Sequence, residues 1–567
     1  MTYLNSYSTK TTPQNEAVPG KNTVPNNAGG FAFAIDKWQR LHRFLILGGE
    51  GGTYYVGERK LTVDNASNVI ACIEEDGARV VSTIVDVSNR GLAPKNDPAL
   101  FALALCFTFG DVQTKHLAQD ALPKVARIGT HLFHFAAYVN NMRGWGRLLR
   151  NSVADWYLEK STKDLVYQVI KYQSRDGWSH ADLLRLSHPR TEDPTRNVIF
   201  KWVVDGWQED WHEASTGFIG TVGNVRNVNG KIISTITRAE PGVRSELYTL
   251  EAVEQLKSMT NSADVIDTII NFNLPREVIP TQWLNDTLVW EALLEKMPLT
   301  AMIRNLGKMT EVGLLTPLSA ASKKIVSELD NIDHIKQARL HPLSILVALN
   351  TYAGGMGIRG HLTWSPVQQV VDALDGAFYS SFGTITPTGK NTMLALDVSG
   401  SMGGPELAGM PGISPRVGSA AMALVTANVE NQYMITGFTN GTNYNAGIMP
   451  LKISPKQRLD DVVRYVSNLP FGGTDCALPM IYAMKNKLPV ETFVIYTDSE
   501  TWAGYIHPFQ ALKQYRDALG IPARLVVVGM TATEISIADP SDAGMMDVTG
   551  FSTDTPEVIS MFSRGEI

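Results

Sequence analysis

Three short segments in the last third of the chain carry oxygen-bearing side chains that together could hold a metal ion. A DVSGS segment supplies an aspartate and two serines, a GGTD segment supplies a threonine, and a TD pair supplies a second aspartate. Two carboxylates and three hydroxyls form a hard-oxygen set, which suits Mg²⁺, Mn²⁺ or Ca²⁺ and not Zn²⁺, and we expect Mg²⁺. Because the chain supplies only two negative charges, the cation would stay electrophilic and accept a carboxylate or phosphate from outside. The five predicted ligands are Asp397, Ser399, Ser401, Thr474 and Asp498.

Each of these segments also has an ordinary structural explanation. A DxSxS pattern occurs by chance, GGT is a common turn, and Asp498 could cap the segment that follows it. The metal interpretation is favoured because all three segments occur in order, each after an expected strand end or at a helix start. Catalysis is less favoured, since no activated nucleophile is recognisable and no histidine neighbours the acids in sequence to act as a base.

The elements that must position these side chains alternate between apolar strands and helices over residues 391–567. This alternation predicts a doubly wound, mostly parallel α/β domain, in which ligands bind at the carboxyl ends of the strands. We expect strands at 392–397, 433–438, 446–453, 492–497 and 523–528, the third of them in a hairpin. We expect helices at 417–430, 457–467, 507–519 and 555–563.

The larger part of the chain before this domain has a mostly helical pattern. Residues 31–365 contain short amphipathic segments with apolar residues at spacings of three and four, separated by glycine and proline. Such a pattern predicts an α-solenoid of stacked helix pairs with degenerate repeats. The clearest predicted helices are 97–107, 133–149, 164–173, 288–295, 303–309 and 345–352.

Three further segments depart from these patterns. Residues 1–30 are rich in Pro, Gly, Asn and Thr without a hydrophobic period, which predicts an extended arm. Residues 216–240 interrupt the helical pattern with glycines, asparagines and β-branched residues, which indicates a hairpin insertion or a loop. Residues 366–390 are expected to connect the helical module to the α/β domain.

Composition excludes several classes of protein. With 567 residues and 62.2 kDa, the chain is long enough for several domains with large cores. Hydrophobic residues make up 44% and charged residues 19%, which is typical of a globular chain. No apolar run approaches the roughly 18 residues that a membrane span needs. No secretory leader is visible and the three cysteines lie far apart, so we expect a cytoplasmic protein without disulfides.

Positive charge is concentrated in one stretch of the helical module. The whole chain carries a net charge of −6, whereas residues 121–190 hold 11 Lys and Arg against five Asp and Glu. A basic patch on a neutral body is typical of a polyanion site, although a solvated helical face would give the same counts. Within this stretch we expect Trp145, Trp156 and Trp178 to pack in the core.

Six basic residues of this stretch are candidates for RNA contact, because arginine and lysine neutralise phosphates and histidine bonds backbone oxygens or 2′-hydroxyls. Three arginines spaced i, i+4 and i+7 would lie on one face of a helix. Farther on, Arg185 and His188 would share an outer side while Leu183, Leu184 and Leu186 face a core. The candidates are Arg143, Arg147, Arg150, Lys171, Arg185 and His188.

Several longer motifs are spread over both modules: GWGRLLRNSVADWYLEK (144–160), KYQSRDGWSHADLLRLSHPR (171–190), LLEKMPLTAMIRNLGKMT (293–310), LHPLSILVALNTYAGGMGIRG (340–360), GGTDCALPMIYA (472–483) and HPFQALKQYR (507–516). They resemble the Ro autoantigen family, which has a TROVE module followed by a von Willebrand factor A domain. The five oxygen ligands resemble, without substitution, the metal-ion-dependent adhesion site of such a domain. The order of the modules also matches, and the Pro- and Asn-rich start resembles the bacterial branch of the family.

The resemblance implies a fold and a function. Ro family proteins form a closed, monomeric ring of HEAT-like helical repeats, which the A domain shuts. A basic central cavity takes single-stranded 3′ ends of misfolded RNA, while small noncoding Y RNAs and duplex parts of structured RNA bind the basic outer surface. Bacterial members act in rRNA maturation and RNA decay with 3′→5′ exonucleases and with polynucleotide phosphorylase. The motif places the family's Y RNA contacts on Lys171 and His188, whereas residues 194–245 depart from the animal pattern and allow no such transfer.

The sequence therefore predicts a non-catalytic RNA-binding protein, and two alternatives stay open. In the first, the metal site captures an acidic side chain of a protein partner and the helical module is only a scaffold. The basic stretch argues against this as the sole role. In the second, the protein is a metal-dependent hydrolase whose RNA cleavage would require Asp397 and Asp498.

Overall fold

The structure is a computed structural model, and it describes residues 11–48, 61, 66–207, 225–228, 231–234, 245–358, 361–382, 385–404, 406–440, 447–469 and 472–567. The chain divides into two compact units that do not follow its linear order. One unit joins residues 1–102 to residues 322–567, and the other comprises residues 103–321. No helix among the described residues is long and apolar enough to cross a membrane.

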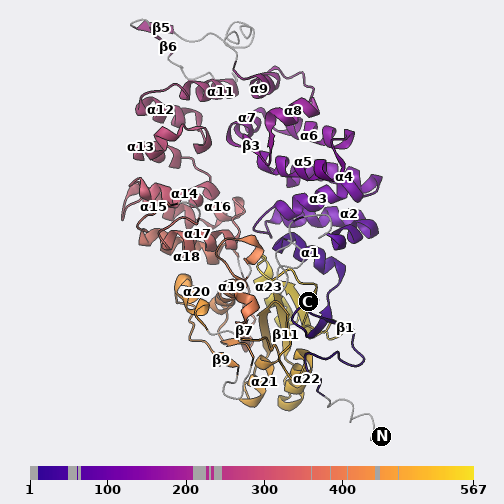
Figure 1. The fold of residues 1–567 in the computed structure, drawn as a ribbon. Helices are drawn as coiled ribbons and strands as arrows, with labels where there is room; N and C mark the ends of the chain where they lie inside the picture. The colour runs from indigo at the N-terminus through magenta and orange to yellow at the C-terminus, as the bar shows by residue number, and fades with distance from the viewer. Residues whose placement is uncertain are drawn as a thin grey trace. The chain divides into compact units, whose positions relative to one another are not determined.

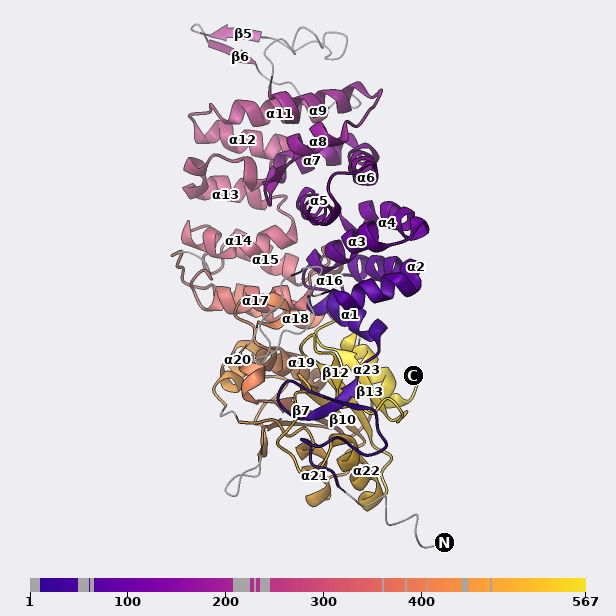
Figure 2. The ribbon, with the colours of Figure 1, turned by 45° about the vertical axis from the view of Figure 1, so that its right-hand side comes forward.

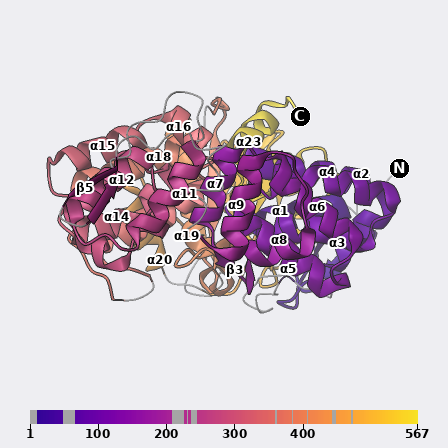
Figure 3. The same cartoon turned by 90° about the horizontal axis from the view of Figure 1, so that it is seen from above.

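The unit of residues 103–321 is built of short helices that pack against their neighbours in the chain. They are α4 (Val112–Val125), α5 (Gly129–Arg143), α6 (Arg147–Glu159), α7 (Thr162–Lys171), α8 (His180–Ser187), α9 (Pro194–Asp205), α11 (Ser245–Leu256), α12 (Ser262–Phe272), α13 (Thr287–Leu294) and α14 (Leu299–Glu311). Two more, α3 (Asp97–Phe109) and α15 (Ala320–Leu329), cross its boundaries. The helices α11 to α14 contact one another in sequence, and α8 contacts both α6 and α9 (Figures 1 and 3). This arrangement confirms the predicted stacking of short helices.

Local polar contacts explain where several of these helices begin. Asp111 accepts the backbone N–H of Thr114 at the start of α4, and the Ser161 side chain caps α7. Ser179 and Asp182 form a reciprocal capping box at the start of α8. Each cap satisfies N–H groups that the first turn of a helix leaves without a partner.

The single helix predicted over 133–149 is wrong. α5 ends at Arg143, α6 begins at Arg147, and two glycines lie between them. Gly144 has a φ of +77°, a backbone conformation that favours glycine and ends a helix. Hydrophobic spacing continues across the break, which is why the pattern alone suggested one helix.

Two short hairpins belong to this unit. β3 (Ser174–Arg175) pairs antiparallel with β4 (Trp178–Ser179), a hairpin for which we expected no strand. β5 (Val225–Val228) pairs antiparallel with β6 (Lys231–Ser234). The second pair confirms the hairpin interpretation for part of 216–240, and the rest of that range lies outside the described residues.

The other unit contains helices from two distant parts of the chain. They are α1 (Lys37–Leu47), α2 (Ser67–Arg90), α16 (Ile332–Gln337), α17 (Pro342–Ala353) and α18 (Gln368–Ser380). α1 packs against α2, and α17 packs against α18. The segment 366–390, predicted as a connection, thus includes a whole helix.

Residues 391–567 form an α/β domain around a six-stranded sheet with the strand order β13-β11-β10-β7-β8-β9. All neighbouring strands are parallel except β8 and β9, which are antiparallel. The strands are β7 (Thr392–Asp397), β8 (Tyr433–Phe438), β9 (Ile448–Pro450), β10 (Thr492–Thr497), β11 (Arg524–Gly529) and β13 (Met545–Thr549). The central strands β7 and β10 are buried over their whole length, as continuous apolar runs in a covered parallel sheet should be.

Two groups of helices cover this sheet. The first is α19 (Pro415–Val429), α20 (Leu459–Ser467) and α23 (Thr555–Arg564), and the second is α21 (Leu478–Lys485) and α22 (Pro508–Leu519). α19 packs against α20 and α23, α21 packs against α22, and the two groups lie on opposite sides of the sheet (Figure 1). The doubly wound prediction is confirmed. β13 and α21 were not predicted, and in β13 the polar Asp547 interrupts the apolar run that marks the other strands.

The described part of the N-terminal arm lies on the α/β domain. β1 (Thr23–Pro25) pairs antiparallel with β2 (Phe31–Ala34), and β2 pairs antiparallel with β12 (Ile535–Ser536). Figure 2 shows this indigo segment running across the domain. The arm is extended, as predicted, but it forms a second sheet with a distant part of the chain.

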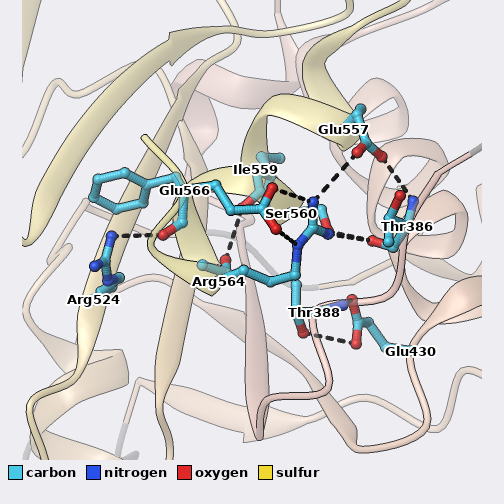
Figure 4. A network of polar contacts seen from close by, with 11 residues as sticks. Thr386, Thr388, Glu430, Arg524, Glu557, Ile559, Ser560, Arg564 and Glu566 are labelled. Atoms are coloured by element: carbon cyan, nitrogen blue, oxygen red, sulfur yellow. Dashed lines mark hydrogen bonds and ion pairs between the residues drawn. The ribbon is translucent and has the colours of Figure 1, made fainter.

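A polar network joins the end of the chain to the segment that enters β7. The guanidinium of Arg564 donates to both carboxylate oxygens of Glu566 at 2.7 Å and to the main-chain oxygen of Thr386 at 3.0 Å (Figure 4). Glu557 accepts the backbone N–H of Thr386 at 2.7 Å, and Glu430 accepts that of Thr388 at 2.7 Å. These bonds hold the segment that leads into β7.

Candidate metal centre and nucleic-acid interface

The five predicted metal ligands follow the ends of adjacent strands or lie in a loop beside them. Asp397 ends β7, Asp498 follows β10 directly, and these two strands are paired in the sheet. Thr474 lies in the loop before α21 and receives backbone bonds from residues 502 and 503, so it lies against the loop after β10. All five side chains are at most 2% exposed. Parallel strands therefore bring together groups that are a hundred residues apart in sequence.

Hydrogen bonds hold the first of these side chains in place. Asp397 Oδ1 accepts the backbone N–H of Ser399 at 2.9 Å, and its Oδ2 accepts the hydroxyl of Thr497 at 2.6 Å. The hydroxyl oxygens of Ser399 and Ser401 lie 3.0 Å apart. The buried Arg416 donates to the main-chain oxygens of residues 398 and 399 at 2.7 and 3.0 Å, which fixes the backbone of the DxSxS turn.

Two of the ligand atoms are buried without a hydrogen-bond partner. They are Oδ2 of Asp498 and Oγ1 of Thr474, whereas Asp498 Oδ1 accepts the backbone N–H of Glu500 at 3.0 Å. A buried polar atom without a partner costs about 1–3 kcal/mol, so each is expected to have a ligand in the functional state. A hard divalent cation would satisfy both atoms, and the residues present therefore fit such an ion.

The electrostatics of the carboxylates lead to the same conclusion. Burial raises the pKa of Asp397, and burial together with the charge of Asp397 raises the pKa of Asp498. A divalent cation would offset both effects. Among the described residues no cluster of three or more His, Cys, Asp or Glu side chains could hold a metal, so a cation at this position would also need the hydroxyl oxygens. Cys476, next to this loop, is fully buried and its pKa is raised well above its ordinary value, which makes it a poor nucleophile.

The predicted arginine face does not exist as a single helical face. Arg143 is the last residue of α5, whereas Arg147 and Arg150 lie on the first turn of α6. All three side chains are exposed. Arg143 donates to the main-chain oxygen of Phe107 at 2.5 Å, which ties it to α3. The three arginines thus lie on two helices joined by a glycine-rich link, and all three are accessible to phosphates.

Lys171 and His188 lie at the C-terminal ends of two consecutive helices. Lys171 is the last residue of α7, is half-buried, and donates to the hydroxyl of Tyr167 at 3.0 Å. Its ammonium also lies 5.5 Å from the ring centre of Tyr172. Burial alone would lower the pKa of Lys171, but the bond to Tyr167 and the neighbouring tyrosines raise it, so the side chain stays cationic. His188 follows α8 with a φ of +48° and is exposed.

The outer side of α8 is only partly as predicted. Arg185 is exposed and donates to the main-chain oxygen of Val204 at 2.7 Å. Leu183 and Leu184 are buried, but Leu186 is 40% exposed, so the expectation that it faces a core is wrong. Leu186 lies two residues before His188, and both side chains are exposed to solvent.

Residues 24–353 match the family model described as the TROVE domain, and residues 391–563 match that described as the Ro60 vWA domain. The chain belongs to the Ro family. It is 39% identical over 559 residues to the RNA-binding protein RO60 of Deinococcus radiodurans, with 98% of each chain covered. It is 36% identical over 595 residues to the RNA-binding protein RO60 of Caenorhabditis elegans, with 96% of this chain and 90% of that one covered.

A solved structure is also similar. The crystal structure of the Deinococcus radiodurans RO (RSR) protein matches with a TM-score of 0.66 and 38% sequence identity, covering 94% of this chain and 100% of that one. Membership of the Ro family confirms the resemblance seen in the motifs. It also confirms a helical TROVE region followed by a von Willebrand factor A domain.

In this Ro family chain, sequence reasoning missed a pair of stacked tryptophans. Trp156 is buried as expected, but Trp145 and Trp178 are only half-buried, and their rings stack at 5.5 Å with an angle of 23°. The indole N–H of Trp145 donates to the main-chain oxygen of Leu186 at 3.3 Å. The pair thus joins the glycine-rich link to the β3–β4 hairpin and to the end of α8, which lie 33 and 41 residues farther along the chain, and no common period relates these positions.

Proposed function

We propose that this Ro family protein is a non-catalytic RNA-binding protein. The observation that carries the proposal is the set of exposed basic side chains within residues 121–190, in a chain 39% identical over 98% of its length to a protein named as RNA-binding. Lys171 and His188 form the centre of the surface that takes a small noncoding Y RNA. Arg143, Arg147 and Arg150 extend it across the link between α5 and α6, and Arg185 lies on α8. Phosphate neutralisation supplies most of the affinity and little sequence choice.

We also propose a second RNA site, which lies in the helical module. Its HEAT-like helices and the A domain form a monomeric ring, and single-stranded 3′ ends of misfolded or structured RNA enter the central cavity. A ring admits a single strand and excludes a duplex by size, so this selectivity requires no base contacts. In the cytoplasm the protein acts with 3′→5′ exonucleases such as polynucleotide phosphorylase, in RNA quality control, rRNA maturation or decay.

Sequencing of RNA that co-purifies with the protein tests the first site. We expect one small structured RNA to be enriched with the wild type and lost with the Lys171→Ala/His188→Ala variant. A matched control is Lys257→Ala/His334→Ala, because these residues are exposed but pair with Glu254 and Glu328. If both double variants retain the RNA equally, the proposed surface is wrong.

A salt titration with that RNA tests the mechanism. If the protein makes 6–10 phosphate contacts, a rise in salt from 50 to 200 mM should weaken RNA binding by about 10³–10⁵-fold. The Lys171→Ala/His188→Ala variant should show a shallower slope than the control variant. An affinity that does not change with salt contradicts binding through phosphates.

For the metal centre we propose Mg²⁺, with Mn²⁺ or Ca²⁺ as substitutes, held by Asp397, Ser399, Ser401, Thr474 and Asp498. When bound, the cation supplies a Lewis-acidic position for one oxygen ligand from outside. The residues themselves bury the site and orient its oxygens. RNA cleavage by the purified protein that is lost in Asp498→Asn would contradict the non-catalytic role and favour a hydrolase.

A second function is favoured by the surroundings of the metal centre. Trp502 is 38% exposed and Tyr505 is 87% exposed, and both lie on the loop that follows Asp498. A protein partner could place a carboxylate on the cation and an apolar side chain against these rings. Asp498→Asn should then abolish capture of purified polynucleotide phosphorylase while leaving RNA affinity unchanged. If capture is retained, or if RNA affinity falls with it, the metal centre does not recruit this partner by itself.

A further inference from the structure

Gln14 in the N-terminal arm is fully buried and uses both ends of its amide. Its Nε2 donates to Oδ1 of Asp475 and to the main-chain oxygen of Ile506, both at 2.8 Å. Its Oε1 accepts the hydroxyl of Thr501 and, at 3.2 Å, the backbone N–H of Gly504. Because a carboxylate at neutral pH only accepts hydrogen bonds, the NH₂ group of the amide must face Asp475.

These contacts fall on the two loops that carry the unpartnered ligand atoms. Asp475 directly follows Thr474, and Thr501 lies three residues after Asp498. The loops are already linked, because the main-chain oxygen of Thr474 accepts the backbone N–H groups of residues 502 and 503 at 3.1 and 3.0 Å. Gln14 adds side-chain links to both loops from the opposite end of the chain.

The rest of the arm holds the same loop after β10. Asn26 donates its amide to the main-chain oxygen of Thr501 at 2.7 Å. The Glu500 carboxylate accepts the backbone N–H of Asn27 at 2.8 Å and its side-chain amide at 2.7 Å. Lys21, by contrast, contacts a different part of the domain, at Asp539 and Ser541. The arm therefore has one set of contacts at the metal loops and another away from them.

We propose that Gln14 is a positioning residue of the metal centre. It sets the spacing between the loops of Thr474 and Asp498, so that the cation is bound tightly only when the arm is docked. The proposal rests on the metal centre proposed above. Hydrogen bonds behind the direct ligands orient those ligands, and their loss weakens metal binding by roughly 10–100-fold in other proteins. Residues 391–567 supply all the direct ligands, and Gln14 in the arm completes their alignment.

Binding of Mn²⁺ to the full-length protein, measured by electron paramagnetic resonance and by competition with Mg²⁺, tests this proposal. Gln14→Met keeps the length of the side chain but removes its hydrogen bonds, and it should weaken Mn²⁺ binding by about 10–100-fold. Lys21→Met is the matched control, because it removes arm contacts away from the metal loops while the bonds of Gln14 remain, and it should leave the affinity unchanged. Equal Mn²⁺ affinity in Gln14→Met and the wild type overturns the proposal, as does an equal loss in Lys21→Met.

A second variant covers the case in which Gln14→Met does not fold. Gln14→Glu keeps the acceptor for Thr501 and Gly504 but places a carboxylate oxygen against Asp475, so the bonds from Nε2 are lost and the two carboxylates repel each other. It should also weaken Mn²⁺ binding, and an unchanged affinity overturns the proposal.

Asp498→Asn separates failure of this inference from failure of the metal centre. If Asp498→Asn leaves Mn²⁺ binding unchanged, the centre itself is wrong and the role of Gln14 falls with it. If Asp498→Asn abolishes binding but Gln14→Met and Gln14→Glu do not weaken it, the centre stands and the role of Gln14 is wrong. The RNA surface at Lys171 and His188 is unaffected by either outcome.

Discussion

The guanidinium of Arg43 in α1 forms a buried two-bond ion pair with the carboxylate of Asp547 in β13. Its Nη2 lies 2.7 and 2.6 Å from the two carboxylate oxygens, and both side chains are at most 8% exposed. Arg43 also donates to the main-chain oxygen of Thr533 at 2.7 Å, and the Thr533 hydroxyl donates to the main-chain oxygen of Asp498 at 3.2 Å. A helix from the start of the TROVE region is thus bonded into the α/β domain next to its metal loop.

Replacing Arg43 should destabilise this unit strongly. Arg43→Met leaves the Asp547 carboxylate buried without its partner, which costs about 3–5 kcal/mol. Arg40→Met is the control, because Arg40 pairs with the exposed Glu534 and such a pair contributes at most about 1 kcal/mol. Urea denaturation followed by circular dichroism measures the difference, and equal effects of the two variants would contradict the assigned role.

The tryptophan pair should affect RNA binding because it positions the segments that it joins. Trp145→Ala removes both the stack on Trp178 and the bond to Leu186, and we expect it to weaken binding of the RNA that co-purifies with the protein about tenfold, or 1.4 kcal/mol. Trp145→Phe keeps an aromatic stack and should recover most of that loss. Trp364→Ala is a matched control, since Trp364 stacks on Tyr352 and donates to a main-chain oxygen in the other unit. Filter binding with the same RNA gives the three affinities.

His180 should make the TROVE region sensitive to acid. Its ring is fully buried, its Nδ1 lies 2.7 Å from the Tyr157 hydroxyl oxygen, and burial lowers its pKa from 6.5 to about 3. Below pH 6.5 the unfolded chain takes up a proton that the folded chain does not, so stability falls as pH falls toward 3. The loss is about 1.4 kcal/mol per pH unit. Between pH 6.5 and 5, His180→Gln should therefore lose about 2 kcal/mol less than the wild type in urea denaturation.

Removal of divalent cations should destabilise the α/β domain. A cation bound at 100 times its Kd stabilises the folded state by about 2.7 kcal/mol, so EDTA should lower the Tm and added Mg²⁺ should restore it. Asp498→Asn should show no difference between EDTA and Mg²⁺. A Tm of the wild type that is insensitive to EDTA would contradict a stabilising metal centre.

Gly30 should be essential for docking of the arm. A Cβ at this position would lie 1.9 Å from the main-chain oxygen of Thr501, so Gly30→Ala must displace the arm or the loop. Limited proteolysis should cleave within residues 11–34 faster in Gly30→Ala than in the wild type. Gly376→Ala is the control, because a methyl group there meets no atom within 4 Å.

Local patterns in the sequence were sufficient for much of the α/β domain. The predicted strands 392–397, 433–438 and 492–497 coincide with β7, β8 and β10, because buried parallel strands are continuous apolar runs. The candidate ligand residues at their ends were predicted for the same reason, since a strand end locates the loop where parallel sheets bind ligands. The family motifs likewise indicated the TROVE region and the A domain.

Long-range contacts were not readable in this way. Gln14 and Asp475 are 461 residues apart and Arg43 and Asp547 are 504 apart, and no spacing rule relates such positions. The arginines around Gly144 follow helical spacing, yet the positive φ of that glycine divides them between two helices.

The sequence by itself predicted many of the elements, the candidate oxygen ligands and the basic stretch, because each depends on residues close together in the chain. Only the tertiary structure decided that the arm docks beside the metal loops and that Trp145 stacks on Trp178. It also showed which oxygens of the candidate ligands are left without a hydrogen-bond partner. These features depend on burial and on hydrogen bonds between distant segments, which form only when the whole chain has folded.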